Sequence, residues 1–345
     1  MKFQSIKLKN FTVFTNCEIT LEAGINVFLG ENGTGKTHIL KLLYSAAQAT
    51  RHDISFSRKI VGTMQPDDMC MHRLLSRTRG NSASTVTVFA SNETGSTRKL
   101  QVAFSKQTKK WNAKTTGEQT WEKDFPKVSS IFIPVQEILS NCHNLPAAVN
   151  TGNIRFDDTY VDIINSAKID ISTGRDTSAR RKLLDSLEKL TKGKVSYDER
   201  ADEFYLRVGN SRQEFNLIAE GIRKVALLWQ LVKNGTLEKG SVLFWDEPEA
   251  NLNPSCIPVI AAFLVALQQA GVQIFLATHD YMLSKYLELY CKGEGNLVFH
   301  SLVIEQGKQE ALRSAHCFSG PSFDGLEHNA ILDSFNDLLN EIYRQ

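Results

Sequence analysis

The sequence predicts an α/β protein with a mainly parallel central sheet, a smaller antiparallel β layer and a short helical insertion. Three observations predict this fold. Short apolar runs typical of buried strands alternate with stretches whose apolar residues recur at helical spacing. A glycine-rich loop lies between an early strand and the helix that follows it. Two later strands end in acidic or polar residues, and this carboxyl edge is where open α/β sheets bind their ligands.

The glycine-rich loop has the sequence GENGTGKT and follows the apolar run 25–29. It matches G-x-x-x-x-G-K-[ST], and strand, loop and helix come in the order that a phosphate-binding loop requires. Backbone N–H groups of such a loop bind phosphate oxygens at a helix N-terminus. Lys36 can reach the β- and γ-phosphates, and Thr37 can hold Mg²⁺. We therefore expect a nucleoside triphosphate to bind here, at Asn32, Gly33, Thr34, Gly35, Lys36 and Thr37.

Composition narrows the class of protein. The 345 residues are 42% hydrophobic and 23% charged with a net charge of +2, which is ordinary for a soluble globular protein and gives no bulk electrostatic case for nucleic-acid or membrane binding. Six cysteines without a C-x-x-C pair favour a reducing compartment over a zinc site or disulfides. No apolar stretch approaches the ~20 residues of a membrane span. We expect a cytoplasmic protein.

The N-terminal half contains predicted strands over 3–8, 17–21, 85–90 and 100–104, the last two as a meander. Residues 130–137 indicate a buried strand that ends at Pro134 and brings Gln136 and Glu137 to its carboxyl end. We expect a first lobe over 1–137. The pattern then turns mainly helical over 138–192. The basic run 175–182 is interpreted as a solvated helix start.

The second half predicts short strands over 195–197, 204–208 and 214–217, then a helix that opens near Gly221. A strand over 241–246, a helix over 258–270 and a strand over 272–280 follow. A hairpin over 298–304 and 311–315 and an amphipathic helix over 329–343 complete the pattern. We expect a helical insertion over 138–212 and a C-terminal lobe over 213–345.

Two of these strands end in candidate catalytic residues. Asp246 and Glu247 follow four apolar residues. Asp246 is the expected partner of Thr37 on Mg²⁺, and Glu247 can polarise a water for attack on the γ-phosphate. Glu137 is the next choice for this base. His279 ends a separate strand, where it could sense or stabilise the γ-phosphate.

These motifs, in this order, resemble the ABC-type ATPase heads of the SMC, RecF and OLD families across nearly the whole chain. Gly30–Thr37 is similar to Walker A, Gln136 to the Q-loop glutamine, and Asp246 with Glu247 to Walker B and its catalytic glutamate. Residues 251–253 occupy the D-loop position, and His279 resembles the switch histidine. Residues 218–221, Ile-Ala-Glu-Gly, stand where a Leu-Ser-x-Gly signature belongs.

The resemblance implies an ABC-type P-loop ATPase head that hydrolyses ATP with Mg²⁺. It implies that Glu247, His279 and Gln136 serve catalysis and that Thr37, Asp246 and Gln136 hold the metal. The Asn10-Phe11 opening would lie near the nucleotide. The signature residues would act on the nucleotide of a second copy; these are Ala219, Glu220, Gly221 and Arg223.

Three departures from the family pattern change what is expected. Ala219 lacks the signature serine's hydroxyl, so backbone N–H groups near Gly221 would have to replace it. Thr12 stands where many relatives carry an arginine. Only about 80 residues separate Gln136 from Ala219, and about 60 follow His279 without an acidic cluster. Neither an SMC-type arm nor a Toprim nuclease domain is expected.

The resemblance also implies how such a head works. Two copies would sandwich ATP, and hydrolysis would separate them and change how a partner is held. Compact heads of this kind are similar to ATPase subunits of bacterial anti-phage systems, which act with a separate nuclease or toxin effector. A DNA repair or recombination head that clamps nucleic acid is the alternative, against which the near-neutral charge counts. A transporter nucleotide-binding subunit is a third alternative. The Asn-Phe opening and the Glu-Pro-Glu-Ala-Asn-Leu stretch of this chain look unlike those of transporters.

Overall fold

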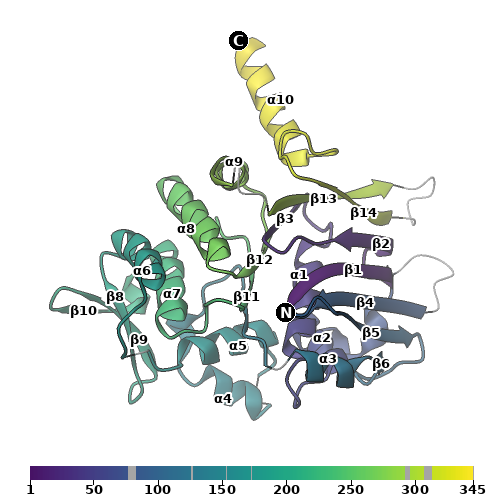
Figure 1. Cartoon of the computed structure of the whole chain (residues 1–345), viewed down its shortest axis with the longest axis horizontal. Coiled ribbons are helices and arrows are strands. Elements are labelled where there is room, and N and C mark those ends of the chain that lie inside the picture. Colours follow the sequence, from purple (N-terminus) through teal and green to yellow (C-terminus); the bar gives the residue numbers. More distant parts are fainter. Residues whose placement is uncertain are drawn as a thin grey trace. The chain divides into compact units, whose positions relative to one another are not determined.

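The computed structural model describes residues 1–76, 83–125, 127–152, 154–171, 173–291, 296–306 and 313–344 (Figure 1). The chain divides into two compact units. Unit 1 comprises Met1–Val128 and Phe275–Gln345, and unit 2 comprises Ser129–Ile274. The mixed parallel and antiparallel α/β architecture confirms the fold class that the sequence predicts.

The antiparallel layer of unit 1 is a five-stranded sheet in the order β2-β1-β4-β5-β6. Its inward side chains alternate along β1, where Phe3, Ile6 and Leu8 are buried, as a sheet with one covered face requires. Helix α3 follows this sheet and buries Trp121, whose Nε1 donates to the Ala46 carbonyl oxygen at 2.9 Å. The elements are β1 (Lys2–Phe11), β2 (Phe14–Thr20), β4 (Ala83–Ser91), β5 (Thr97–Ser105), β6 (Lys114–Thr116) and α3 (Glu118–Asp124).

Strand β3 (Ile25–Gly30) carries the phosphate loop at its carboxyl end, and all six of its residues are buried. It pairs in parallel with β13 (Leu297–Gln306), which pairs antiparallel with β14 (Arg313–Gly320). Through this pairing the C-terminal segment belongs to unit 1. Residues 311–312 of the expected hairpin lie outside the described residues. Helices α1 (Lys36–Gln48) and α2 (Phe56–Met64) and the 3₁₀ turns Asp67–Met69 and Met71–Leu74 follow β3.

Two further helices complete unit 1. Helix α9 (Tyr281–Tyr290) follows His279. The amphipathic helix α10 (Ala330–Arg344) runs away from β13 and β14 (Figure 1). Its first turns are held by Phe335, whose ring stacks on Tyr281 at 4.1 Å between centroids.

Unit 2 contains a parallel pair, β7 (Ser130–Ile133) and β11 (Val242–Asp246), in which every residue is buried. Strands buried on both faces need such continuous apolar sequences. The chain passes between the units within β12 (Gln273–Ala277). The helices of unit 2 are α4 (Leu145–Asn150), α5 (Asp158–Ala167), α6 (Ser178–Thr191), α7 (Glu220–Lys233) and α8 (Ile257–Gln269), with 3₁₀ turns at Leu139–Asn141 and Pro254–Cys256.

A small antiparallel sheet, in the order β10-β9-β8, lies between α6 and α7 in the chain. It contains β8 (Lys194–Asp198), β9 (Glu203–Val208) and β10 (Ser211–Glu214). The strand expected over 214–217 is wrong, because β10 ends at Glu214 and Phe215–Leu217 form a 3₁₀ turn. All four residues of β10 are exposed, whereas Phe215 is only 2% exposed. The chain therefore turns after Glu214, which places the Phe215 ring 5.9 Å from the Phe204 ring between centroids.

The surface of α6, the cysteines and the polar side chains have the following arrangement in the described residues. The basic run on α6 forms surface ion pairs, Arg180 with Glu238 at 3.0 Å and Arg181 with Asp185 at 2.5 Å, as a solvated helix should. All six cysteines, which lie in the described ranges, are unbridged. Within those ranges there is no cluster of three or more metal-ligating His, Cys, Asp or Glu side chains. No helix built from them has the length and apolarity to cross a membrane.

Candidate ATPase site

The phosphate loop between β3 and α1 is folded around its own lysine. Lys36 is 6% exposed, and its Nζ donates to the carbonyl oxygens of Gly30 at 2.8 Å and Glu31 at 2.9 Å. Gly35 has φ 97°, and a Cβ there would come within 2.6 Å of the Phe14 ring, so glycine is required. Gly35 is also the N-cap of α1 and brings no side-chain oxygen to the first N–H groups of the helix. These donors are therefore suited to an anion.

The Asn10-Phe11-Thr12 turn packs beside α1. Asn10 and Thr12 both have left-handed φ angles, and the Asn10 amide donates to the Ala83 carbonyl oxygen at 2.9 Å. Thr12 Oγ1 lies 3.1 Å from His38 Nδ1. Burial, helped by Lys41, lowers the pKa of His38 to about 4. Phe11 is fully buried, so its ring supports the turn and offers no surface to a nucleotide.

His279 follows β12 and belongs to unit 1. Its neighbours are both anchored: the Thr278 N–H donates to the Phe28 carbonyl oxygen at 3.1 Å, and Asp280 caps α9 by accepting from the Leu283 N–H at 2.5 Å. The Asp280 N–H also donates to Thr278 Oγ1 at 3.0 Å. The backbone on either side of His279 is therefore fixed. The imidazole itself is partly exposed.

In unit 2, the end of β11 presents the two expected carboxylates. Asp246 is 5% exposed. Glu247 adopts φ 48°, a left-handed conformation that costs a non-glycine residue free energy and is often found at functional sites. The turn that follows is closed by the Ala250 N–H, which donates to the Glu247 carbonyl oxygen at 3.1 Å. The strained backbone sets the direction of the Glu247 side chain relative to Asp246.

Tyr160 on α5 is a neighbour that the sequence did not reveal. Burial raises the pKa of Tyr160, and the nearby carboxylates of Asp157 and Asp246 act in the same direction, while a hydrogen bond with the Gln136 backbone opposes them. The structure thus brings Gln136 and Asp246 to one side chain. No motif marks this tyrosine, because it lies inside an ordinary amphipathic helix.

The signature segment packs against the D-loop of its own chain. A Cβ on Gly221 would lie 2.5 Å from the Asn251 carbonyl oxygen, so the two backbones touch. Lys224, 2% exposed, donates from Nζ to the Ala250 carbonyl oxygen at 2.9 Å. Burial lowers the pKa of Lys224, and surrounding carboxylates oppose this shift, namely Glu220, Glu249, Glu247 and Glu137. Sequence reasoning missed Lys224, although a lysine in an apolar helix run was its signal.

Arg223 joins the signature segment to the residue after Gln136. Its Nε lies 2.6 Å from Glu137 Oε2, with the two side chains 15% and 0% exposed. Arg223 Nη1 also donates to the carbonyl oxygens of Phe215 at 3.1 Å and Ile218 at 2.7 Å. Glu137 Oε1 in turn accepts from the Leu139 N–H at 2.5 Å. Arg223 therefore points into its own chain, and Glu137 is held as a counter-ion, which argues against it as the base.

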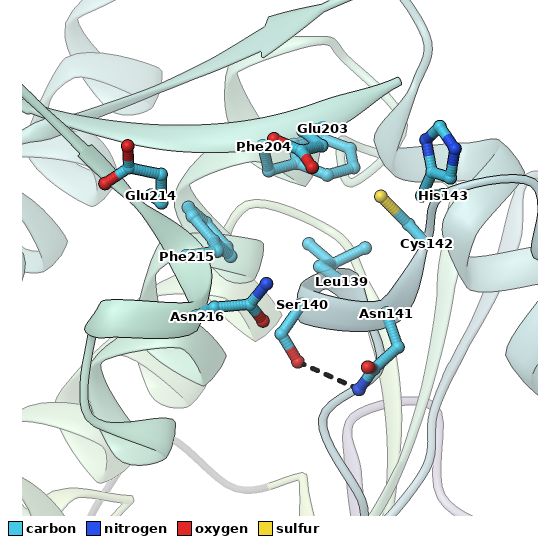
Figure 2. Close-up of a pocket in the computed structure, with 10 residues that line it drawn as sticks. All are labelled: Leu139, Ser140, Asn141, Cys142, His143, Glu203, Phe204, Glu214, Phe215 and Asn216. Atoms are coloured by element: carbon cyan, nitrogen blue, oxygen red, sulfur yellow. Dashed lines mark hydrogen bonds between the residues drawn. The ribbon is translucent and has the colours of Figure 1, made fainter. Parts of the chain in front are cut away.

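A pocket of about 270 Å³ lies between the two segments that this ion pair joins (Figure 2). In this view Phe215 and Leu139 lie on opposite sides of the pocket, and Phe204 lies above them. Ser140 Oγ accepts from Asn141 Nδ2 at 3.2 Å at its edge.

The predicted site residues thus fall into two groups. Asn10, the phosphate loop and His279 lie in unit 1, whereas Gln136, Asp246, Glu247 and the signature segment lie in unit 2. Within unit 2 the structure brings Gln136, Asp246 and the Arg223–Glu137 pair together around the ends of β7 and β11.

The fold and these residues define an ABC-type P-loop ATPase head of the SMC and RecF type. The chain belongs to the family described as "AAA domain, putative AbiEii toxin, Type IV TA system", whose model matches residues 25–284.

A curated relative and two solved structures agree with this class. The DNA replication and repair protein RecF of Clostridium botulinum is 36% identical over 61 residues, which are 18% of this chain and 17% of that protein, so the match spans less than a fifth of the relative. The SMC head bound to the C-winged helix domain of ScpA superposes with a TM-score of 0.59 at 10% identity, covering 92% of this chain and 97% of that one. The Smc head domain derived from Pyrococcus furiosus superposes with a TM-score of 0.55 at 10% identity, and the match covers 99% of this chain and 99% of that one. These structures are similar in fold.

Proposed function

We propose that this chain binds ATP with Mg²⁺ and hydrolyses it as a conformational switch. The observation that carries the proposal is the phosphate loop closed on Lys36 at the N-terminus of α1. The carbonyl oxygens that now accept from Lys36 Nζ hold the ammonium inside the loop, where the phosphates of ATP would replace them as acceptors.

The remaining predicted site residues would share the chemistry of hydrolysis. Thr37, Asp246 and Gln136 would hold Mg²⁺ together with phosphate oxygens, and the metal would neutralise charge on the phosphates. Few protein ligands are needed, because Mg²⁺ keeps waters and substrate oxygens. Glu247 would orient and deprotonate the attacking water. His279, between two anchored residues, would contact the γ-phosphate.

We further propose that the chain acts as an ATP-dependent homodimer that controls a separate effector, a nuclease or toxin, in the cytoplasm as part of anti-phage defence. The family description, which names a toxin and a toxin–antitoxin system, supports an effector. A partner protein is supported by the SMC heads, which are bound to ScpA. In the dimer, the α7 N-terminus would offer N–H groups to the partner's γ-phosphate, since Ala219 has no hydroxyl.

The test is a binding titration with a fluorescent ATP analogue. Lys36→Ala should abolish binding, because the cation that contacts the phosphates is lost. Lys41→Ala, a lysine on the same helix, is the matched control and should bind normally. Equal affinity of Lys36→Ala and the control would remove the phosphate-loop assignment.

A DNA repair head is the second candidate, favoured by the RecF match. The net charge of +2 gives no general support for it. DNA affinity that falls steeply between 50 and 200 mM salt, as ~6 phosphate contacts would require, would favour this candidate over effector control.

A further inference from the structure

The β8–β9 pair places two cations directly opposite each other. Lys194 is the cross-strand partner of Arg207, and like charges in this position destabilise a sheet. Among the described residues neither forms an ion pair. Arg212, the next cation across on β10, is by contrast bound to Asp198 at 2.7 Å and stacked on the Tyr205 ring. Lys194 and Arg207 are both exposed, so water screens their repulsion, but no carboxylate of the described chain neutralises either charge.

The same two cations line a pocket of about 370 Å³ between the small sheet and helices α6 and α7. Its floor is apolar and buried: Leu184 is 1%, Val195 3% and Trp229 3% exposed. Ile171, 40% exposed, stands at its edge. A concave apolar site with a few charged groups at its rim is typical of small-molecule binding.

The other charged groups of this pocket are already paired. Lys233 Nζ lies 2.9 Å from Asp176 Oδ2. Glu188 accepts from Trp229 Nε1 at 3.0 Å and pairs with Arg181 at 3.3 Å. Four cations and two carboxylates line the pocket, so its lining carries two positive charges in excess. These are the charges of Lys194 and Arg207.

We propose that this pocket binds a small phosphate monoester with an apolar or aromatic body. A phosphate monoester carries a charge of about −1.5 to −2 at pH 7, which matches the two uncompensated cations, whereas a carboxylate supplies only one. The planar guanidinium of Arg207 can bind two phosphate oxygens at once. The apolar body of the ligand then packs against Trp229 at the floor of the pocket. The pocket lies wholly in unit 2, and the proposal does not depend on ATP hydrolysis.

Calorimetric titration with phenyl phosphate tests this site, using the full chain with Lys36→Ala so that the phosphate loop does not compete. Lys194→Gln and Arg207→Gln should each weaken binding by about tenfold or more, the usual effect of losing a charge-assisted hydrogen bond. Arg212→Gln is the matched control from the same sheet and should bind normally. Benzoate should bind at least about tenfold more weakly, and phenyl phosphate should bind less tightly below pH ~6 as it gains a proton.

Several results would overturn the proposal. They are the absence of phenyl phosphate binding, equal binding by the Lys194→Gln/Arg207→Gln double variant, and equal binding of benzoate. A 5′-phosphorylated oligonucleotide that binds these two residues more tightly than phenyl phosphate would exclude a small ligand. Because neither substitution removes a buried group, the variants should fold, and unchanged circular dichroism checks that they do.

Discussion

The buried ion pair between Arg223 and Glu137 gives the sharpest structural prediction. Glu137→Gln keeps the size of the side chain and an oxygen for the Leu139 N–H, but it removes the charge opposite a guanidinium that is 15% exposed. Removing one partner of a buried pair costs about 3–5 kcal/mol, because the other charge is left buried and uncompensated. Arg223 keeps two carbonyl acceptors, so we expect Glu137→Gln to lower the free energy of unfolding by the lower end of this range, about 3 kcal/mol.

The assay is urea unfolding of the wild type and variants. Asp185→Asn is the matched control, since it breaks an exposed pair with Arg181 whose side chains are 46% and 48% exposed. Solvent screens such a pair, so its loss should barely move the unfolding midpoint. The double variant Glu137→Gln/Arg223→Met should lose less free energy of unfolding than the two single variants lose in total. If Glu137→Gln costs no more than Asp185→Asn, the pair does not hold the signature segment to the loop after Gln136.

Two further predictions concern a close backbone contact and two buried histidines. Gly221→Ala should destabilise by about 1–3 kcal/mol, since its Cβ would meet the Asn251 carbonyl oxygen at 2.5 Å; an unfolding midpoint equal to wild type would contradict this contact. Burial lowers the pKa of His38 to about 4 and of His300 to about 3, below the ordinary 6.5. The unfolded chain therefore binds more protons below pH 6.5, and the free energy of unfolding should fall as pH drops towards 4, by about 1 kcal/mol per histidine between pH 6.5 and 5.5. Urea titrations of His300→Gln at both pH values should show a smaller fall, and an identical fall would refute the assignment.

Elements with strong periodicity were predictable from the sequence, and long-range contacts were not. The apolar runs of β3 and β11 identify buried strands because each strand is covered on both faces. The end of β10 could not be located from the sequence, because an aromatic residue such as Phe215 is common in strands. Only the folded chain shows that Phe215 packs against Phe204.

The candidate site shows the same limit. The loop and the Asp246–Glu247 pair follow from local patterns. The left-handed Glu247, the Arg223–Glu137 pair and the contact of Gly221 with Asn251 depend on segments brought together only by folding. Arg223, which the resemblance assigns to the neighbouring copy's nucleotide, is directed inward by acceptors on its own chain. No spacing in the sequence encodes that direction.

The most direct test of ATPase function is single-turnover hydrolysis of ATP by Glu247→Gln beside the wild type. The substitution keeps the side chain's size at a strained position and removes its negative charge together with its basicity. We predict that the variant binds ATP and Mg²⁺ as the wild type does, hydrolyses ATP at least ~100-fold more slowly, and accumulates as an ATP-bound dimer. Hydrolysis by Glu247→Gln at the wild-type rate would contradict Glu247 as the base, and a wild-type chain that binds no ATP would contradict the account as a whole.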